Sequence, residues 1–197
     1  MSEAVQIAIT SSAATLVVSL GSIYLSHRLE MARQRSLREN EVRLRVFASI
    51  MGQRLVVAQL YVSRFEAFIF SDYHEARWRI DQHPKDSIDL QEAQRWMHKS
   101  EDLALEVAKA NRELFEAVAS ARALFVRSPV LETLADAVYH HSVPVVRVRP
   151  NGGMNVETLE EWKATAVREI QESVTRAIEQ PIEALISHLA PLVRRDS

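Results

Sequence analysis

The chain of 197 residues has no cysteine, only four glycines and only six prolines. Without cysteine it can form no disulfide, no thiolate nucleophile and no cysteine-based zinc or iron–sulfur site. All but one of the glycines and prolines follow residue 50. So few turn-forming residues predict long helices and argue against a strand-rich fold.

Charge is almost absent from the N-terminal end. Residues 1–27 hold one acid, Glu3, and no lysine or arginine. Residues 28–60 hold seven arginines and three glutamates, a net charge of +4, so the total of −2 leaves −5 for residues 61–197. A nucleic-acid-binding domain typically spreads positive charge over its surface. We therefore expect no nucleic-acid partner.

The uncharged run from Ala4 to Ser26 predicts a transmembrane helix. At 1.5 Å per residue it would span roughly 34 Å, enough for a hydrocarbon core of about 30 Å with some tilt. A cleaved signal peptide needs positive charge before its apolar stretch, and only Glu3 precedes this one. The buried N-terminal helix of a soluble protein is the alternative that stays open.

A basic collar follows this run and consists of Arg28, Arg33, Arg35 and Arg38. Because cytoplasmic flanks carry the lysine and arginine excess, the N-terminus should lie outside and the C-terminal domain in the cytoplasm. The expected location is the inner (cytoplasmic) membrane, crossed once. The collar is also expected to face anionic lipid, although orientation of the chain alone would explain it.

Small and hydroxyl residues recur along one side of the predicted span. This hydroxyl seam consists of Ala8, Ser12, Thr15, Ser19, Ser22 and Ser26. The hydroxyls could bond to their own backbone and mean little. They could instead pack against a second copy. Lipid gives apolar helices no hydrophobic drive to associate, so small residues that allow close approach and hydroxyl bonds across the interface would hold the copies together. A water-lined pore formed by several copies is the third interpretation.

The helical pattern continues without a break beyond Ser26. One apolar row repeats every seven residues and is accompanied by a second. The rows are Leu37, Leu44, Met51, Ala58 and Phe65, and Ala48, Leu55, Val62 and Ile69. This spacing marks one side of a long amphipathic helix. At about 100° per residue, that side would continue the face of the hydroxyl seam.

Turn signals divide the rest of the chain. His83-Pro84 predicts the end of the long helix, and a second helix should run from about residue 88 to 126. Ser128-Pro129 predicts the start of a third helix that ends near residue 141. Asn155 should cap the last helix, and residues 142–155 are open between a short strand and a loop.

Two prolines fall within or after this last helix. Pro181 is expected to kink it, because its ring clashes with the carbonyl of Ala177. Pro191 is expected to end it.

The predicted fold class is therefore all-α. A transmembrane helix (4–26) continues into an arginine-rich neck and long amphipathic helix (27–70). The remainder (71–197) forms an antiparallel cytoplasmic helical bundle to which the neck contributes.

Catalytic motifs are missing from the sequence. There is no glycine-rich phosphate loop, no Gly-x-Ser-x-Gly elbow and no His-Glu-x-x-His pair. We predict no catalytic, cofactor-binding or metal-binding residues, no cofactor, and no enzymatic activity. The spacing of Arg77 and His83 in "RWRIDQH" resembles that of the helical HEPN ribonucleases. That resemblance implies a ribonuclease with both residues at a dimer interface, but neither Asn nor Asp follows Arg77.

The segment "LRVFASIMGQR", residues 44–54, is similar to the neck of some uncharacterised bacterial single-span membrane proteins. These have an N-terminal anchor, an arginine-rich neck and a cytoplasmic helical domain. The similarity does not extend through residues 71–197. It implies the same layout, and some proteins of this layout are thought to act in phage defence, including as pore-forming effectors.

The expected function is that of a membrane-anchored, self-associating scaffold, sensor or regulator at the cytoplasmic membrane face. Its expected partners are the lipid bilayer, further copies of itself and an unidentified protein. An oligomeric pore-forming effector is the alternative. A membrane-tethered HEPN-like ribonuclease is a more distant third.

Overall fold

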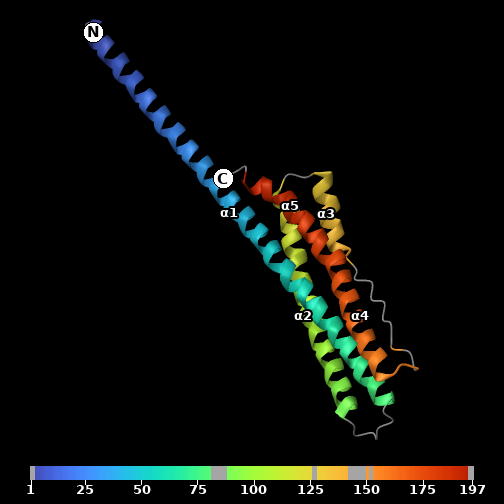
Figure 1. Cartoon of the computed structure of the whole chain (residues 1–197). Coiled ribbons are helices and arrows are strands. Elements are labelled where there is room, and N and C mark those ends of the chain that lie inside the picture. The colour runs from blue at the N-terminus through green and yellow to red at the C-terminus, as the bar shows by residue number, and fades with distance from the viewer. Residues whose placement is uncertain (1–2, 81–87, 126–127, 142–149, 151–152, 195–197) are drawn as a thin grey trace. The chain divides into compact units, whose positions relative to one another are not determined.

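The protein is all-α, as the sequence predicts. The computed structural model describes the backbone of residues 3–80, 88–125, 128–141, 150 and 153–194, and the side chains of these residues from 22 to 193. No strand occurs within those ranges. The helices are α1 (Glu3–Ile80), α2 (Ile88–Leu124), α3 (Pro129–Tyr139), α4 (Val156–Val174) and α5 (Gln180–Arg194), with a π-helical segment, η1 (Thr175–Glu179), between the last two (Figure 1).

Helix α1 is continuous over 78 residues, which confirms that nothing interrupts the helical pattern after Ser26. The chain forms two compact units, Met1–Val42 and Arg43–Ser197. The division between them falls inside α1 and inside the predicted neck of residues 27–70.

The second unit is an antiparallel helical bundle. Gln53 of α1 contacts Glu113 of α2, whereas Ser71, further along α1, contacts Ala93 near the start of α2. As one helix advances the other recedes, so the two run in opposite directions. The same holds against the C-terminal helices, since Arg54 meets Glu183 of α5 and Glu66 meets Gln171 of α4.

All the helices of the bundle contribute to one apolar core. Side chains with no exposed surface include Ile50 and Val57 of α1, Leu114 and Val118 of α2, Leu131 of α3, and Leu185 and Leu189 of α5. Burying a side chain of this size typically stabilises the fold by about 1.5–3 kcal/mol. The described helices therefore share a core, and the bundle depends on contacts between residues far apart in sequence.

The predicted N-caps of α3 and α4 are confirmed. Ser128 accepts a hydrogen bond on its Oγ from the backbone N–H of Leu131 at 3.0 Å, and Pro129 occupies the first turn. Asn155 accepts one on its Oδ1 from the N–H of Thr158 at 2.8 Å, and the Thr158 Oγ1 accepts one from the N–H of Asn155 at 3.0 Å. These bonds satisfy donors that the first helical turn leaves unpaired.

The two C-terminal prolines behave differently from each other. Before Pro181 the helix widens into the π-helical turn, where the N–H of Gln180 bonds to the carbonyl of Thr175. A turn of this width relieves the clash between a proline ring and the preceding carbonyls. The prediction that Pro191 ends the helix was wrong, because Pro191 lies inside α5, which continues to Arg194.

Other expectations lie outside the described residues. His83, Pro84 and the possible strand within 142–149 belong to segments that are not described.

Candidate functional site

An uncovered apolar face lies on the part of α1 that belongs to the bundle. We define the exposed face as Leu44, Ala48, Met51 and Leu55. Leu44 is 49% exposed, Met51 48% and Leu55 66%, and Ala48 is exposed as well. Their 4-3-4 spacing places them on one side of the helix.

This face points away from the core. Leu55 stands about 140° around the helix axis from Ile50 and about 160° from Val57. Ile50 and Val57 are completely buried. Helix α1 is thus apolar on two opposite sides over this stretch, and the bundle covers only one of them.

The seven-residue row predicted from the sequence divides into two halves. Leu44 and Met51 are exposed, whereas Ala58 is 3% and Phe65 5% exposed. A row that repeats every 7 residues drifts by about 20° per repeat on a straight α-helix, so it turns gradually toward the core. Over the buried half, helix α4 also lies alongside, since Gln171 donates a hydrogen bond to Glu66 at 3.2 Å.

Gly52 lies beside the exposed face. A Cβ built on it meets no atom within 4 Å, so the helix backbone is open to close approach there. Together with Ala48, it makes this part of the face shallow. Small residues of this kind let another helix come near.

The predicted hydroxyl seam is described only at its end. Residues 8, 12, 15 and 19 lie in helical backbone whose side chains are outside the described set. Ser22 and Ser26 are exposed. The three interpretations of the seam, as backbone-bonded hydroxyls, a packing interface or a pore lining, stay predictions.

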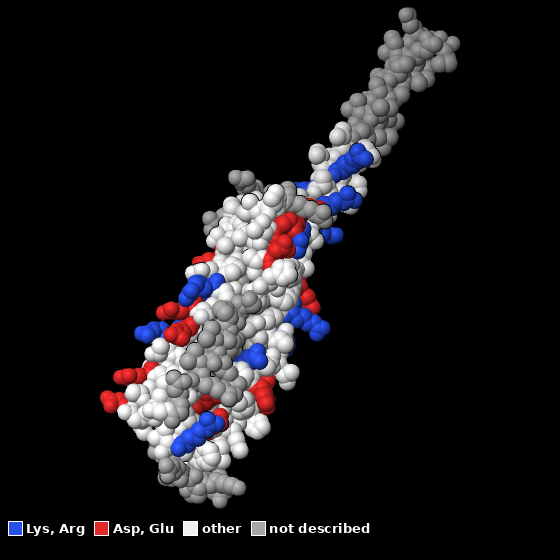
Figure 2. All heavy atoms as spheres, turned by 90° about the vertical axis from the view of Figure 1, so that its right-hand side faces the viewer, with Lys and Arg blue, Asp and Glu red and all other residues white. Residues whose placement is uncertain are grey.

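The basic collar lies in the first unit and is exposed throughout. In Figure 2, blue lysine and arginine side chains stand out from the single helix of this unit. The Arg28 guanidinium lies 5.5 Å from the centre of the Tyr24 ring, within cation–π range. Ile23, Tyr24 and Leu25, just before the collar, are all exposed by 60% or more.

Among the described side chains, one helix is long and apolar enough to cross a membrane, and it is α1 from Ser22 onward. Core helices of soluble bundles pass the same test of length and composition. The finding is a long apolar N-terminal helix, and the predicted span of residues 4–26 and its orientation stay predictions.

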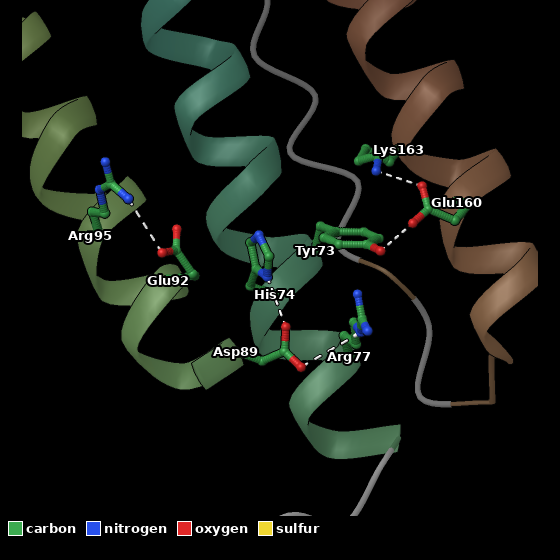
Figure 3. A network of polar contacts seen from close by, with 8 residues as sticks. All are labelled: Tyr73, His74, Arg77, Asp89, Glu92, Arg95, Glu160 and Lys163. Carbon is green, nitrogen blue, oxygen red and sulfur yellow. Dashed lines mark hydrogen bonds and ion pairs between the residues drawn. The ribbon is translucent and has the colours of Figure 1, made fainter. Parts of the chain in front are cut away.

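A polar cluster joins three helices near the C-terminal end of α1. It consists of Tyr73, His74 and Arg77 on α1, Asp89 on α2, and Glu160 and Lys163 on α4 (Figure 3). His74 Nδ1 lies 2.9 Å from Asp89 Oδ1, and Arg77 Nε lies 3.6 Å from Asp89 Oδ2. Each contact connects the last turns of α1 to the first turn of α2.

The other half of the cluster connects α1 to α4. The Tyr73 hydroxyl donates a hydrogen bond to Glu160, and Lys163 Nζ lies 2.5 Å from Glu160 Oε2. The same ammonium lies 4.1 Å from the centre of the Tyr73 ring. Glu160 therefore receives two donors, and Lys163 has both a carboxylate and an aromatic face.

These contacts shift two titrations. Hydrogen bonds from Lys163 and from Tyr73 lower the pKa of Glu160 below its usual value. Burial, followed by the hydrogen bond to Glu160, raises the pKa of Tyr73. Tyr73 therefore stays protonated as a donor while Glu160 stays ionised as its acceptor.

The cluster fits a structural clamp better than a reaction centre. Asp89 is engaged by two cationic or donor groups and Glu160 by two others. Among the residues described, no group of three or more histidines and carboxylates could hold a metal ion. Arg77 pairs with Asp89, while His83, its partner in the HEPN-like spacing, lies outside the described residues.

Sequence reasoning did not find this cluster. His74 and Asp89 are 15 residues apart across a turn, and Tyr73 and Glu160 are 87 apart. Only the bundle topology brings them together. The one available signal was the position of Asp89 in the first turn of α2, where acids are favoured for a different reason, the helix dipole.

No protein-family model matches the chain, and no curated protein or solved structure matches it either. The similarity of residues 44–54 to bacterial neck segments stays a prediction.

Proposed function

We propose that the chain is a membrane-anchored helical protein that self-associates through α1 and acts as a scaffold, sensor or regulator at the cytoplasmic membrane face. The observation that carries the proposal is the exposed face of Leu44, Ala48, Met51 and Leu55. A contiguous apolar face opposite the core typically marks an interaction site. Its spacing is that of a helix–helix seam.

A second copy is the partner that fits this face. The heptad spacing is typical of helices that pair with helices of the same period, and Ala48 and Gly52 permit close approach. If each copy is anchored by the same N-terminal segment, membrane insertion also aligns the copies side by side. Binding is then between molecules already held at high local concentration.

The absence of native cysteine gives a direct test. Single cysteines are placed at successive positions from 8 to 26 and at 44, 48, 51 and 55, and isolated membranes are oxidised. Position 105, where the leucine is 74% exposed on α2, is the control. We expect disulfide-linked dimers at 44, 48, 51 and 55, with a periodic maximum at 12, 15, 19 and 22, and none at 105.

Uniform or absent crosslinking along α1 would contradict self-association. Recovery of the chain in the soluble fraction after membrane separation would contradict anchoring. Ion leakage from vesicles that contain the purified chain would instead favour the pore-forming alternative.

A further inference from the structure

We propose that the basic collar binds the phosphate headgroups of anionic phospholipids, and that these lipids form a ring around α1. The proposal rests on the membrane anchoring proposed above and names the lipid class that the neck recognises. It concerns the first unit alone, in which all four arginines are exposed.

The arginines surround the helix axis. At about 100° per residue, Arg33, Arg38 and Arg35 stand roughly 140°, 280° and 340° around the axis from Arg28, which leaves no gap wider than about 140°. A protein or a nucleic acid docked on one side would reach only some of them. A headgroup layer crossed by the helix contacts all four at once.

The axial position of the collar also fits a headgroup layer. Exposed Ile23, Tyr24 and Leu25 precede it, and they are the apolar and aromatic types found where a helix leaves the hydrocarbon core. From Arg28 to Arg38 the helix rises about 15 Å. That length covers an interfacial layer together with the region, about 8–10 Å deep, over which its charge is felt at physiological salt.

The charge of this stretch selects anions. Between Arg28 and Arg38 the only acid is Glu30, whose carboxylate accepts a hydrogen bond from Gln34 at 3.3 Å. The net charge is therefore +3 over these residues. Each guanidinium has a planar fork of donors that matches phosphate oxygens, so phosphate is better matched than a diffuse negative surface.

The test uses the full chain with one added cysteine. Leu29 is 67% exposed and lies within the collar, so Leu29→Cys, labelled with a small fluorophore, reports the lipids beside it. The protein is reconstituted in vesicles of phosphatidylcholine and phosphatidylglycerol. A nitroxide quencher is carried either by the zwitterionic or by the anionic lipid, at equal total composition.

We expect quenching from labelled phosphatidylglycerol to indicate about fivefold local enrichment over phosphatidylcholine at low salt, and less at high salt. Changing the four collar arginines to Gln should remove the enrichment, whereas changing them to Lys should retain only part of it, because an ammonium group keeps the charge but lacks the planar fork. Arg95→Gln combined with Arg112→Gln is the matched control, since these arginines are 79% and 76% exposed on α2. The control should behave as the unaltered chain does.

Equal quenching by both lipids, or enrichment that survives the Gln variant, would overturn the lipid selectivity while leaving the anchor intact. Absence of quenching by either lipid would overturn the membrane anchoring, and this proposal with it. Helical content measured by circular dichroism shows that each variant is folded.

Discussion

Tyr73 of α1 donates a hydrogen bond to Glu160 of α4, 87 residues further along the chain. Lys163, one turn after Glu160, pairs with the same carboxylate and lies over the Tyr73 ring. Tyr73 is only 3% exposed, whereas the Glu160 side chain is 48% exposed, so this bond lies at the edge of the bundle and holds α4 against the end of α1. The polar cluster therefore fixes how the C-terminal helices dock.

Tyr73→Phe should lower the free energy of unfolding by about 1 kcal/mol. The substitution removes one hydrogen bond to a charged acceptor but keeps the ring that packs beneath Lys163. Urea unfolding followed by circular dichroism measures the change. Tyr24→Phe is the control, because Tyr24 is 60% exposed and its substitution should leave the unfolding midpoint unchanged. Equal effects of the two substitutions would show that the hydrogen bond contributes nothing.

Acid should weaken the same contact. The pKa of Glu160 lies below its usual value of 4.5 in the folded chain, so around and just below pH 4.5 the unfolded state binds more protons. The stabilisation is complete above that value and is lost as the pH falls through the folded pKa. Glu160→Gln should therefore flatten the dependence of unfolding free energy on pH between about pH 5 and 3.

The neighbouring Glu161 provides the control for this pH profile. It is exposed on the same turn of α4. Glu161→Gln should leave the acid side of the profile as in the unaltered chain. A profile that Glu160→Gln does not flatten would show that other carboxylates govern acid unfolding.

Local signals predicted the helices well. The N-caps at Ser128 and Asn155 were identified from single residue types, because a cap depends on its own turn. Pro191 was misjudged for a related reason. Local preference disfavours proline inside a helix, yet the missing hydrogen bond near a helix end costs little when packing of residues such as Leu189 holds the helix in place.

The candidate sites could be predicted only in part. The sequence revealed an apolar row along α1 but could not tell that Leu44 and Met51 stay uncovered while Phe65 is buried. That distinction depends on the drift of the row and on where α4 lies. The polar cluster could not be predicted, since the pairing of Tyr73 with Glu160 exists only once the bundle has formed.

The different burial of two leucines on α2 predicts very different effects of their substitution on the unfolding free energy. Leu114 has no exposed surface, whereas Leu105 is 74% exposed. Leu114→Ala should destabilise the bundle by about 3 kcal/mol, through lost apolar burial and the cavity that remains. Leu105→Ala should change the unfolding free energy by less than about 0.5 kcal/mol. Both are measured by denaturant unfolding, and similar values for the two would contradict the arrangement of the core.

The exposed face on α1 predicts a substitution that separates folding from association. Leu55 is 66% exposed, so Leu55→Glu should leave the unfolding free energy within about 0.5 kcal/mol of the unaltered chain. If copies pair through this face, each glutamate would be buried against apolar side chains near its counterpart, and association should fall at least tenfold.

Sedimentation in detergent micelles measures the association. Leu105→Glu, at a leucine of α2 that is 74% exposed, should leave the association unchanged. If both variants associate like the unaltered chain, the face is not where copies meet. If both dissociate, the effect comes from added charge and not from the position of Leu55.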